Sequence, residues 1–236
     1  MKIYLSPSDQ VNNPYSYGGT NEARQCRRIA QACKTALERN GFEVKTNFAD
    51  GSNAMYERVR ESNAWGADIH LCIHTNAGGG RGCVVFVSSR SEGRMKYAQP
   101  IFDELDAITL HRSVYGIREK QFYEIRNTSG TCIYCECEFH DSPETAQWIV
   151  EHTDDIGEAL CRGICRAAGK DYIGKGSEND MIRWEKLEDI PSGYREMAKR
   201  FVDAGALRGK DGGVLDITED MLRTMEIMRR YFEGEA

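Results

Sequence analysis

Short apolar segments alternate with helix-like segments along most of the chain, and this alternation limits the fold more than any other feature does. The apolar segments have the length and residue types of strands, whereas the segments between them carry apolar residues at helical spacing. Such alternation favours a sheet with helices on both faces. We therefore predict an α/β fold with a mixed, mostly parallel sheet. The expected strands are residues 2–5, 42–47, 67–80, 82–89, 122–127 and 131–139, and the expected helices are residues 21–40, 55–66, 92–109 and 143–169.

Polar loops are expected at one edge of this sheet. In open α/β sheets, ligands bind at the loops that leave the carboxyl ends of the strands. The loops that leave there are residues 6–21, 74–82 and 140–145. We therefore expect a functional site at this edge.

One strand places unusual side chains together. In residues 132–142, CIYCECEFHDS, strand alternation puts Glu136, Glu138 and His140 on one face. Cys135 and Cys137 point to the opposite face, toward a helix layer. Burying a carboxylate is costly unless it is paired or bound to a metal. Two interpretations stay open at this point, a solvated surface face and a metal or acid–base site.

Two further residues can join such a site. His74 ends a buried strand just before a glycine loop, where an imidazole can bind a metal, although a core histidine is the simpler interpretation. Glu22 lies in the first turn of a helix, where a carboxylate commonly complements the helix dipole. His70 lies about 13 Å back along the strand from His74 and is interpreted as structural.

Composition excludes several classes of function. The formal net charge is −6, so binding of nucleic acid through phosphates is not expected. No apolar run approaches the roughly 20 residues of a membrane helix, so membrane insertion is not expected. The first residues, MKIYLSPSDQ, do not have the pattern of a signal peptide, which predicts synthesis in the cytoplasm. The nine cysteines are expected to be mostly free thiols.

The C-terminal part of the chain has a different character. Residues 174–180, GKGSEND, are typical of a linker, and we place a main domain at residues 1–173. Residues 181–236 predict two helices, the second capped by Thr218. A segment of this size forms only a marginal core alone. We therefore expect this helical module to dock on the main domain or on a second copy of itself.

Several segments, in order, resemble the zinc-dependent N-acetylmuramoyl-L-alanine amidases of the Amidase_3 type. KIYLSPSDQ stands where the family has a strand ending in Asp-Pro-Gly-His-Gly, and GTNE supplies a glutamate at a helix start. ERVRESNAWGADIHLCIHTNA matches the family's Arg…Ala-Asn…Ala-Asp…Ser-Ile-His-Ala-Asn-Ala stretch. FYEIRNT and CIYCECEFHDSPE match the segments around its catalytic glutamate. The resemblance covers about residues 1–172.

The resemblance implies a function and roles for individual residues. It implies hydrolysis of the amide bond between N-acetylmuramic acid and the L-alanine of the peptidoglycan stem peptide. Glu22 and His74 would bind Zn²⁺, and Glu136 would be the catalytic glutamate that takes a proton from the attacking water. Asn76 and Arg126 match family positions and are expected to contact the substrate, although Arg126 also fits a structural pair.

The family's first zinc ligand, a histidine, has no counterpart in this sequence. Asp9 stands in its place, and a catalytic zinc normally has three protein ligands. Three alternatives remain open: His140 supplies the third ligand, Asp9 does so, or the site is inactive. The subgroup that begins with Ser-Pro-Ser carries a Phe-His pair at the position of Phe139 and His140, which favours His140. An ideal strand would put His140 about 13 Å from Glu136, so the strand must end near Phe139 and curl.

The resemblance also suggests where the protein acts and which other functions compete with the amidase activity. A phage endolysin or an autolysin that acts on the cell wall after release fits the expected cytoplasmic synthesis. The competing functions are a zinc peptidase that cuts within the stem peptide and a non-catalytic wall-binding protein. Glu138 has no family role and either orients His140 or is solvated. Residues 181–236 resemble a single S-layer-homology repeat, which would bind the wall, and otherwise form a homodimerisation segment.

Overall fold

The structure is a computed structural model that describes residues 1–49, 53–176, 183–207, 214–215 and 217–233. It forms two compact units, residues 1–174 and residues 175–236. Each unit has a hydrophobic core of its own, and the two are described separately below.

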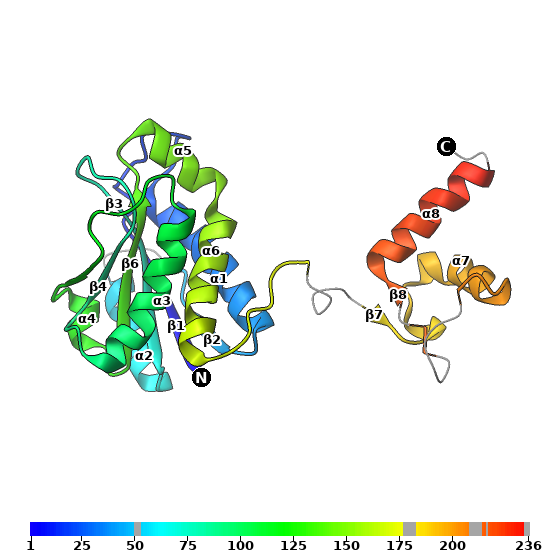
Figure 1. The fold of residues 1–236 in the computed structure, drawn as a ribbon, viewed down its shortest axis with the longest axis horizontal. Coiled ribbons are helices and arrows are strands. Elements are labelled where there is room, and N and C mark those ends of the chain that lie inside the picture. Colours follow the sequence, from blue (N-terminus) through cyan, green and yellow to red (C-terminus); the bar gives the residue numbers. More distant parts are fainter. Residues whose placement is uncertain (50–52, 177–182, 208–213, 216, 234–236) are drawn as a thin grey trace. The chain divides into compact units, whose positions relative to one another are not determined.

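A six-stranded sheet forms the centre of the first unit (Figure 1). Its order is β2-β1-β3-β6-β4-β5, and every neighbouring pair is parallel except β4 and β6. The prediction of a mixed, mostly parallel sheet is confirmed. The strands are β1 (Lys2–Pro7), β2 (Glu43–Thr46), β3 (Ile69–Asn76), β4 (Val84–Val87), β5 (Ile117–Glu119) and β6 (Thr131–Phe139).

Helices cover both faces of this sheet, as predicted. Three long helices, α1 (Glu22–Arg39), α3 (Glu92–Ile108) and α6 (Thr153–Ala168), pack together on one face (Figure 1). The helices α2 (Ala54–Trp65) and α4 (Tyr123–Asn127) pack on the other face. The helix α5 (Pro143–Glu151) follows the end of β6. Ser142 is its N-cap, and the Ser142 Oγ atom accepts a hydrogen bond from Thr145 N.

The main core lies between the sheet and the three long helices. Alternate residues of the central strands, such as Leu71, Ile73, Ile133 and Cys135, are fully buried there. Two glycines in α6 allow the helices to approach closely. A Cβ atom at Gly157 would lie 2.7 Å from Cys33 N of α1, and one at Gly163 would lie 2.5 Å from Ile101 Cα of α3.

The structure corrects two sequence predictions in this unit. Residues 122–127, expected to be a strand, contain the short helix α4. In β6, the pairing with β3 shifts: His74 pairs with Glu136, whereas Asn76 pairs with Phe139. This β-bulge adds one residue to β6 and reverses the alternation beyond it. His140 therefore lies on the opposite face from Glu136, and the prediction of one shared face is wrong.

The described residues of the second unit form two α-helices, a 3₁₀ helix and a short antiparallel pair of strands. Its elements are β7 (Arg183–Trp184), the 3₁₀ helix η1 (Leu187–Asp189), α7 (Ser192–Asp203), β8 (Ile217–Thr218) and α8 (Glu219–Glu233). Thr218 Oγ1 accepts a hydrogen bond from Met221 N at 3.2 Å, which confirms the predicted cap. Most of the expected linker, from residue 177 to 180, lies outside the described residues.

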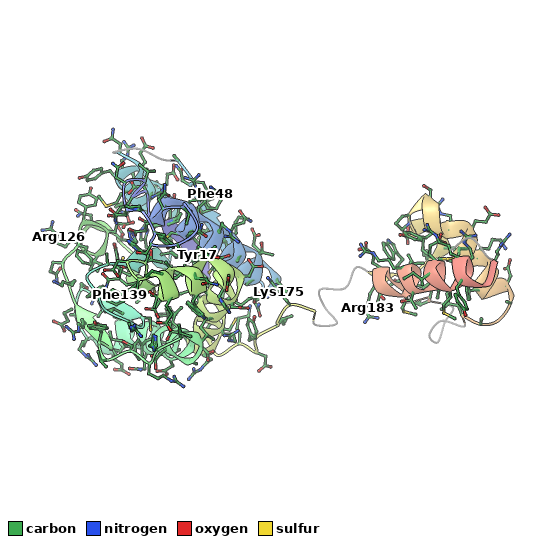
Figure 2. All side chains as sticks on the ribbon, turned by 90° about the horizontal axis from the view of Figure 1, so that it is seen from above. Tyr17, Phe48, Arg126, Phe139, Lys175 and Arg183 are labelled. Carbon is green, nitrogen blue, oxygen red and sulfur yellow. The ribbon has the colours of Figure 1, made fainter. Side chains whose placement is uncertain are left out.

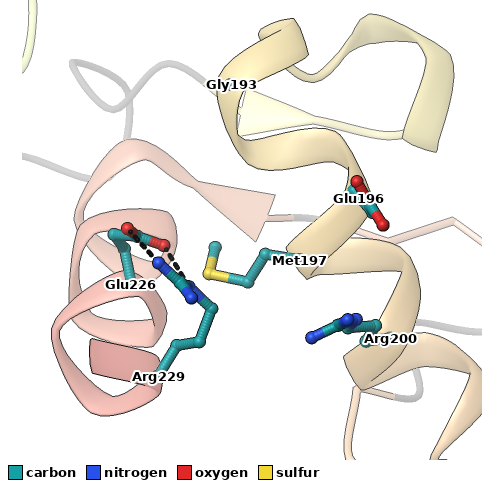
Figure 3. A pocket seen from close by; sticks show the side chains of 6 residues that line it. All are labelled: Gly193, Glu196, Met197, Arg200, Glu226 and Arg229. Atoms are coloured by element: carbon teal, nitrogen blue, oxygen red, sulfur yellow. Dashed lines mark hydrogen bonds and ion pairs between the residues drawn. The ribbon is translucent and has the colours of Figure 1, made fainter. Parts of the chain in front are cut away.

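The two helices of this unit line an open, polar pocket. Met197 of α7 lies between the helices, and Glu226 accepts hydrogen bonds from Arg229 on the same helix (Figure 3). The pocket has a volume of about 250 Å³ and is lined by Gly193, Glu196, Met197, Arg200, Glu226 and Arg229. Across both units, no described helix is both long and apolar enough to span a bilayer.

Candidate active site

The three polar loops predicted at the carboxyl edge of the sheet lie together. Ser16 N of the first loop donates to His140 O of the third at 3.0 Å. Asp141 Oδ2 of the third loop accepts from Gly78 N and Gly79 N of the second at 2.6 and 2.7 Å. The buried Arg58 donates to Pro7 O at 2.7 Å, which holds the start of the first loop.

Glu22 and His74 form the centre of this edge. Asn21 caps α1 by accepting from Arg24 N, and this places the buried Glu22 in the first turn. His74 Nδ1 lies 3.0 Å from Glu22 Oε1. Burial alone would raise the pKa of Glu22, but the hydrogen bond and charge of His74 hold it below its ordinary value. Burial alone would lower the pKa of His74, but Glu22 and Glu136 raise it.

Glu136 lies beside this pair because it is in register with His74 on the neighbouring strand. Its Oε2 atom is buried and has no hydrogen-bond partner among the described residues. Burial raises the pKa of Glu136 to about 7, and the nearby Glu22 also raises it, whereas His74 lowers it. A carboxyl group with such a pKa can exchange a proton near neutral pH.

His140 approaches the same edge from the other face of the sheet. Its Nδ1 lies 2.9 Å from Thr75 Oγ1, and Thr75 Oγ1 lies 2.8 Å from the Tyr15 hydroxyl. The Tyr15 ring stacks on the imidazole with the ring centres 4.8 Å apart. Burial lowers the pKa of His140, although Glu22 partly opposes this. The imidazole is therefore favoured in its neutral form, which is the form that binds metals.

The first loop brings Gln10, rather than Asp9, to Glu22 and His74. Asp9 Oδ2 accepts a hydrogen bond from Met55 N in α2 at 3.1 Å. Gln10 Nε2 lies 3.4 Å from both Glu22 Oε1 and His74 Nδ1. Asn13 Nδ2 donates to Glu22 Oε2 at 2.8 Å. Gln10 and Asn13 were not predicted as site residues, because neither stands in a periodic pattern.

The other candidate residues, Asn76, Arg126 and Glu138, differ in burial and in their contacts. Asn76 is half-buried at the end of β3, and its carbonyl oxygen accepts from His140 N at 2.8 Å. Arg126 is exposed on α4, and Figure 2 shows it at the rim of the unit. Glu138 is buried and accepts from Gly82 N and Phe139 N. Both hydrogen bonds end on Oε1, and Glu138 Oε2, like Glu136 Oε2, is buried without a partner among the described residues.

A second polar group lies deeper in the sheet. Ligand atoms of His70, Cys72 and Glu124 lie within 4.8 Å of one another, and all three residues are buried. This group could hold a metal ion. The interpretation of His70 as structural is compatible with its contact to Glu124, whose Oε1 lies 3.1 Å from His70 Nε2. Glu124 was missed because its segment was expected to be a strand.

The residues at the edge of the sheet offer the atom types of a zinc site. Glu22 and His74 present an oxygen and a nitrogen 3.0 Å apart, and both atom types bind Zn²⁺. Among the described residues, the group of three whose ligand atoms all lie within 4.8 Å of one another is His70, Cys72 and Glu124, so His140 is not equally close to both Glu22 and His74. His140 Nδ1 is occupied by Thr75, which leaves Nε2 as the nitrogen that can bind a metal. The unpartnered Oε2 of Glu136 matches the acceptor that a bound water needs.

Comparison with known proteins assigns the chain to a family. A profile of the N-acetylmuramoyl-L-alanine amidase family Amidase_3 matches residues 8–166, so the chain belongs to this family. The sporulation-specific N-acetylmuramoyl-L-alanine amidase of Bacillus subtilis (strain 168) is 33% identical over 170 residues, which are 69% of this chain and 65% of that protein. The endolysin of Bacillus phage SPP1 is 26% identical over 185 residues, which are 74% of this chain and 66% of that protein.

A solved structure confirms the architecture of the first unit. The crystal structure of an N-acetylmuramoyl-L-alanine amidase from Clostridium difficile 630 matches with a TM-score of 0.65. The match covers 71% of this chain and 96% of that chain at 19% identity, so it shows a shared fold. The chain spans just under two thirds of the length of the two Bacillus-related relatives described above.

Proposed function

We propose that this protein is a peptidoglycan hydrolase that cleaves the amide bond between N-acetylmuramic acid and the L-alanine of the stem peptide. The main support is the position of Glu136. Its unpartnered, buried Oε2 lies beside the Glu22–His74 pair at the edge where the three loops meet. Membership of the amidase family supports the same reaction.

Each residue of the site has a distinct task in this proposal. Glu22, His74 and His140 hold one Zn²⁺ ion, and Thr75 keeps the Nδ1 atom of His140 occupied. Zn²⁺, when bound, lowers the pKa of water and polarises the amide carbonyl group. Glu136 takes the proton from the attacking water at its Oε2 atom and passes it to the leaving nitrogen of L-alanine. Asn76 and Arg126 remain candidates for substrate contacts.

Asp9 is a weaker candidate for the third zinc ligand than His140 is. Its carboxylate accepts a hydrogen bond from Met55 N and lies 4.0 Å from Arg58 Nη1. These contacts direct it toward the start of α2. His140, in contrast, has one ring nitrogen occupied and the other available.

The products of wall digestion test the proposed reaction. We expect the purified protein with Zn²⁺ to release intact stem peptides that carry a new amino group on L-alanine, together with unsubstituted N-acetylmuramic acid in the glycan. Mass spectrometry of digested peptidoglycan measures both products. Cleavage within the stem peptide would instead indicate a zinc peptidase. Binding to the wall without any cleavage would indicate the non-catalytic alternative.

The substrate determines where the protein has to act. We propose that the protein acts on the bacterial cell wall after release, as an endolysin or an autolysin does. The relatives include both a phage endolysin and a sporulation-specific amidase, so they do not favour one of these settings over the other.

For the second unit, we propose that α8 forms a homodimer contact. Met221, Met228 and Tyr231 follow one another at helical spacing on α8, and Ile227 lies beside them. All four side chains are exposed, and Ile227 and Tyr231 are 68% and 73% exposed. A second copy of the helix would cover this apolar face. Wall binding is a second candidate, which the polar pocket between α7 and α8 favours.

The oligomeric state of the full chain tests the dimer. We expect light scattering to give twice the mass of one chain, and Ile227→Glu to give the monomer, because a charge would then be buried in the contact. Val114→Glu is the matched control, since Val114 is an exposed apolar residue of the first unit. A monomeric wild-type protein that binds isolated cell walls would favour the wall-binding candidate instead.

A further inference from the structure

A buried carboxylate lies behind His74, on the side of the ring away from Glu22. Glu124 points from α4 toward the sheet and is 2% exposed. Its Oε1 atom accepts a hydrogen bond from Ser6 Oγ at 2.5 Å and lies 3.1 Å from His70 Nε2. Residues of β1, β3 and α4 therefore converge on this one carboxylate.

The second oxygen of Glu124 faces His74. Glu124 Oε2 lies 3.9 Å from His74 Nε2, while His74 Nδ1 lies 3.0 Å from Glu22 Oε1. The Tyr134 ring stacks on the imidazole, with ring centres 4.4 Å apart and an angle of 21° between the planes. The His74 ring thus has a carboxylate facing each nitrogen and an aromatic ring on one face.

This arrangement bears on which nitrogen of His74 carries the proton. A metal ion binds the unprotonated nitrogen of a neutral imidazole, so a metal held at Nδ1 requires the proton on Nε2. In the structure, Nδ1 lies 3.0 Å from Glu22 Oε1 and donates to it, so this proton has to leave when a metal binds. The charge of the Glu124 carboxylate, 3.9 Å from Nε2, then favours the proton on Nε2 and this direction of the ring. Ser6 and His70 hold Oε1, which leaves Oε2 directed at His74.

We propose that Glu124 is a positioning residue, which sets the tautomer and the orientation of His74 for metal binding through Nδ1. Ser6 and His70 support it by fixing its carboxylate. The inference rests on the proposed function, because it assumes that His74 binds the metal. It assigns the polar group His70, Cys72 and Glu124 to the support of the zinc site and not to a second metal ion.

The test compares Glu124→Gln with the wild-type protein. The variant keeps the shape of the side chain but removes its charge. We expect competition with a chelating dye to show zinc affinity weakened by about 10- to 100-fold, the usual effect of losing such a partner. We also expect ¹⁵N NMR of the zinc-loaded wild type to show His74 bound through Nδ1 with its proton on Nε2, and the signals of this form to weaken in the variant at the same zinc concentration.

Two further variants separate positioning from folding. Glu158→Gln is the matched control, because Glu158 is a buried carboxylate that binds Arg39 at the far end of α1 from Glu22. We expect it to keep wild-type zinc affinity. Ser6→Ala keeps Glu124 but removes one of its supports, and we expect a smaller loss in the same direction. Circular dichroism confirms that each variant is folded.

Several results would overturn the inference. Zinc affinity of Glu124→Gln within twofold of the wild type, with an unchanged His74 tautomer, would do so. Two zinc ions per wild-type chain, one of them lost in Cys72→Ser, would show that Glu124 is itself a ligand. If the wild-type protein binds no zinc, the proposed function fails and the inference fails with it, whereas full zinc binding by both proteins overturns the inference alone.

Discussion

Replacing Glu136 with glutamine is expected to reduce the rate of peptidoglycan hydrolysis by about 10²- to 10⁴-fold, the usual contribution of a general base. The amide has the shape of the carboxylate but cannot take a proton from water. Glu136 lies in register with His74 and is not one of the proposed zinc ligands, so zinc binding should persist. The measurement is the rate of amine release from purified peptidoglycan, with the zinc content determined in the same samples.

Glu138→Gln is the matched control for this experiment. Glu138 lies two residues away on β6, but its carboxylate accepts hydrogen bonds from Gly82 N and Phe139 N. We expect a rate within about tenfold of the wild type, because Glu138 Oε1 holds the loop after β3 and Glu138, unlike Glu136, is not in register with His74. An active Glu136→Gln protein, within tenfold of the wild-type rate, would exclude Glu136 as the base.

The architecture of the first unit was predictable because its signals are local and repeated. Buried parallel strands give continuous apolar runs such as residues 69–73, and the helices between them carry apolar stripes. The carboxyl edge follows from the topology alone, and the three loops do meet there. These features depend on many residues at once, so a single exception does not change the prediction.

The short segment at residues 122–127 shows where such reasoning fails. FYEIRN has the aromatic and β-branched residues of a strand, yet it forms a helix of five residues. Packing decides its structure: Ile125 enters the core, and Tyr123 makes an edge contact with Tyr56 of α2. Periodicity is uninformative over so few residues. Because the segment was expected to be a strand, Glu124 was not predicted as a site residue. In the structure it lies in the first turn of α4 and is buried against the sheet.

The bulge in β6 shows why the site was only partly predictable. Alternation correctly placed Glu136 opposite Cys135, because the register holds as far as His74 and Glu136. One extra residue before Phe139 then moves His140 to the face of Thr75. A bulge depends on the pairing of two distant segments, so neither segment reveals it alone. The contacts of Gln10 and Asn13 depend in the same way on the path of a loop.

Replacing His140 with alanine is expected to weaken zinc binding by more than 100-fold. A catalytic zinc site normally has three protein ligands, and the variant would keep only Glu22 and His74. Loss of a ligand should exceed the 10- to 100-fold effect of losing a partner that only orients one. Hydrolysis should fall in parallel at limiting zinc. Chelator competition measures the affinity, and amine release measures the activity.

His152→Ala is the control for this variant, since His152 lies at the junction of α5 and α6 and stacks on Trp148. We expect it to keep wild-type affinity for zinc. Thr75→Val removes only the partner of His140 Nδ1. Its loss of zinc affinity should therefore lie between the large loss in His140→Ala and the unchanged affinity of His152→Ala. Full zinc binding by His140→Ala, with loss of zinc in Asp9→Asn, would move the third ligand to Asp9. That outcome would require the Asp9 carboxylate to leave Met55 N and turn toward Glu22.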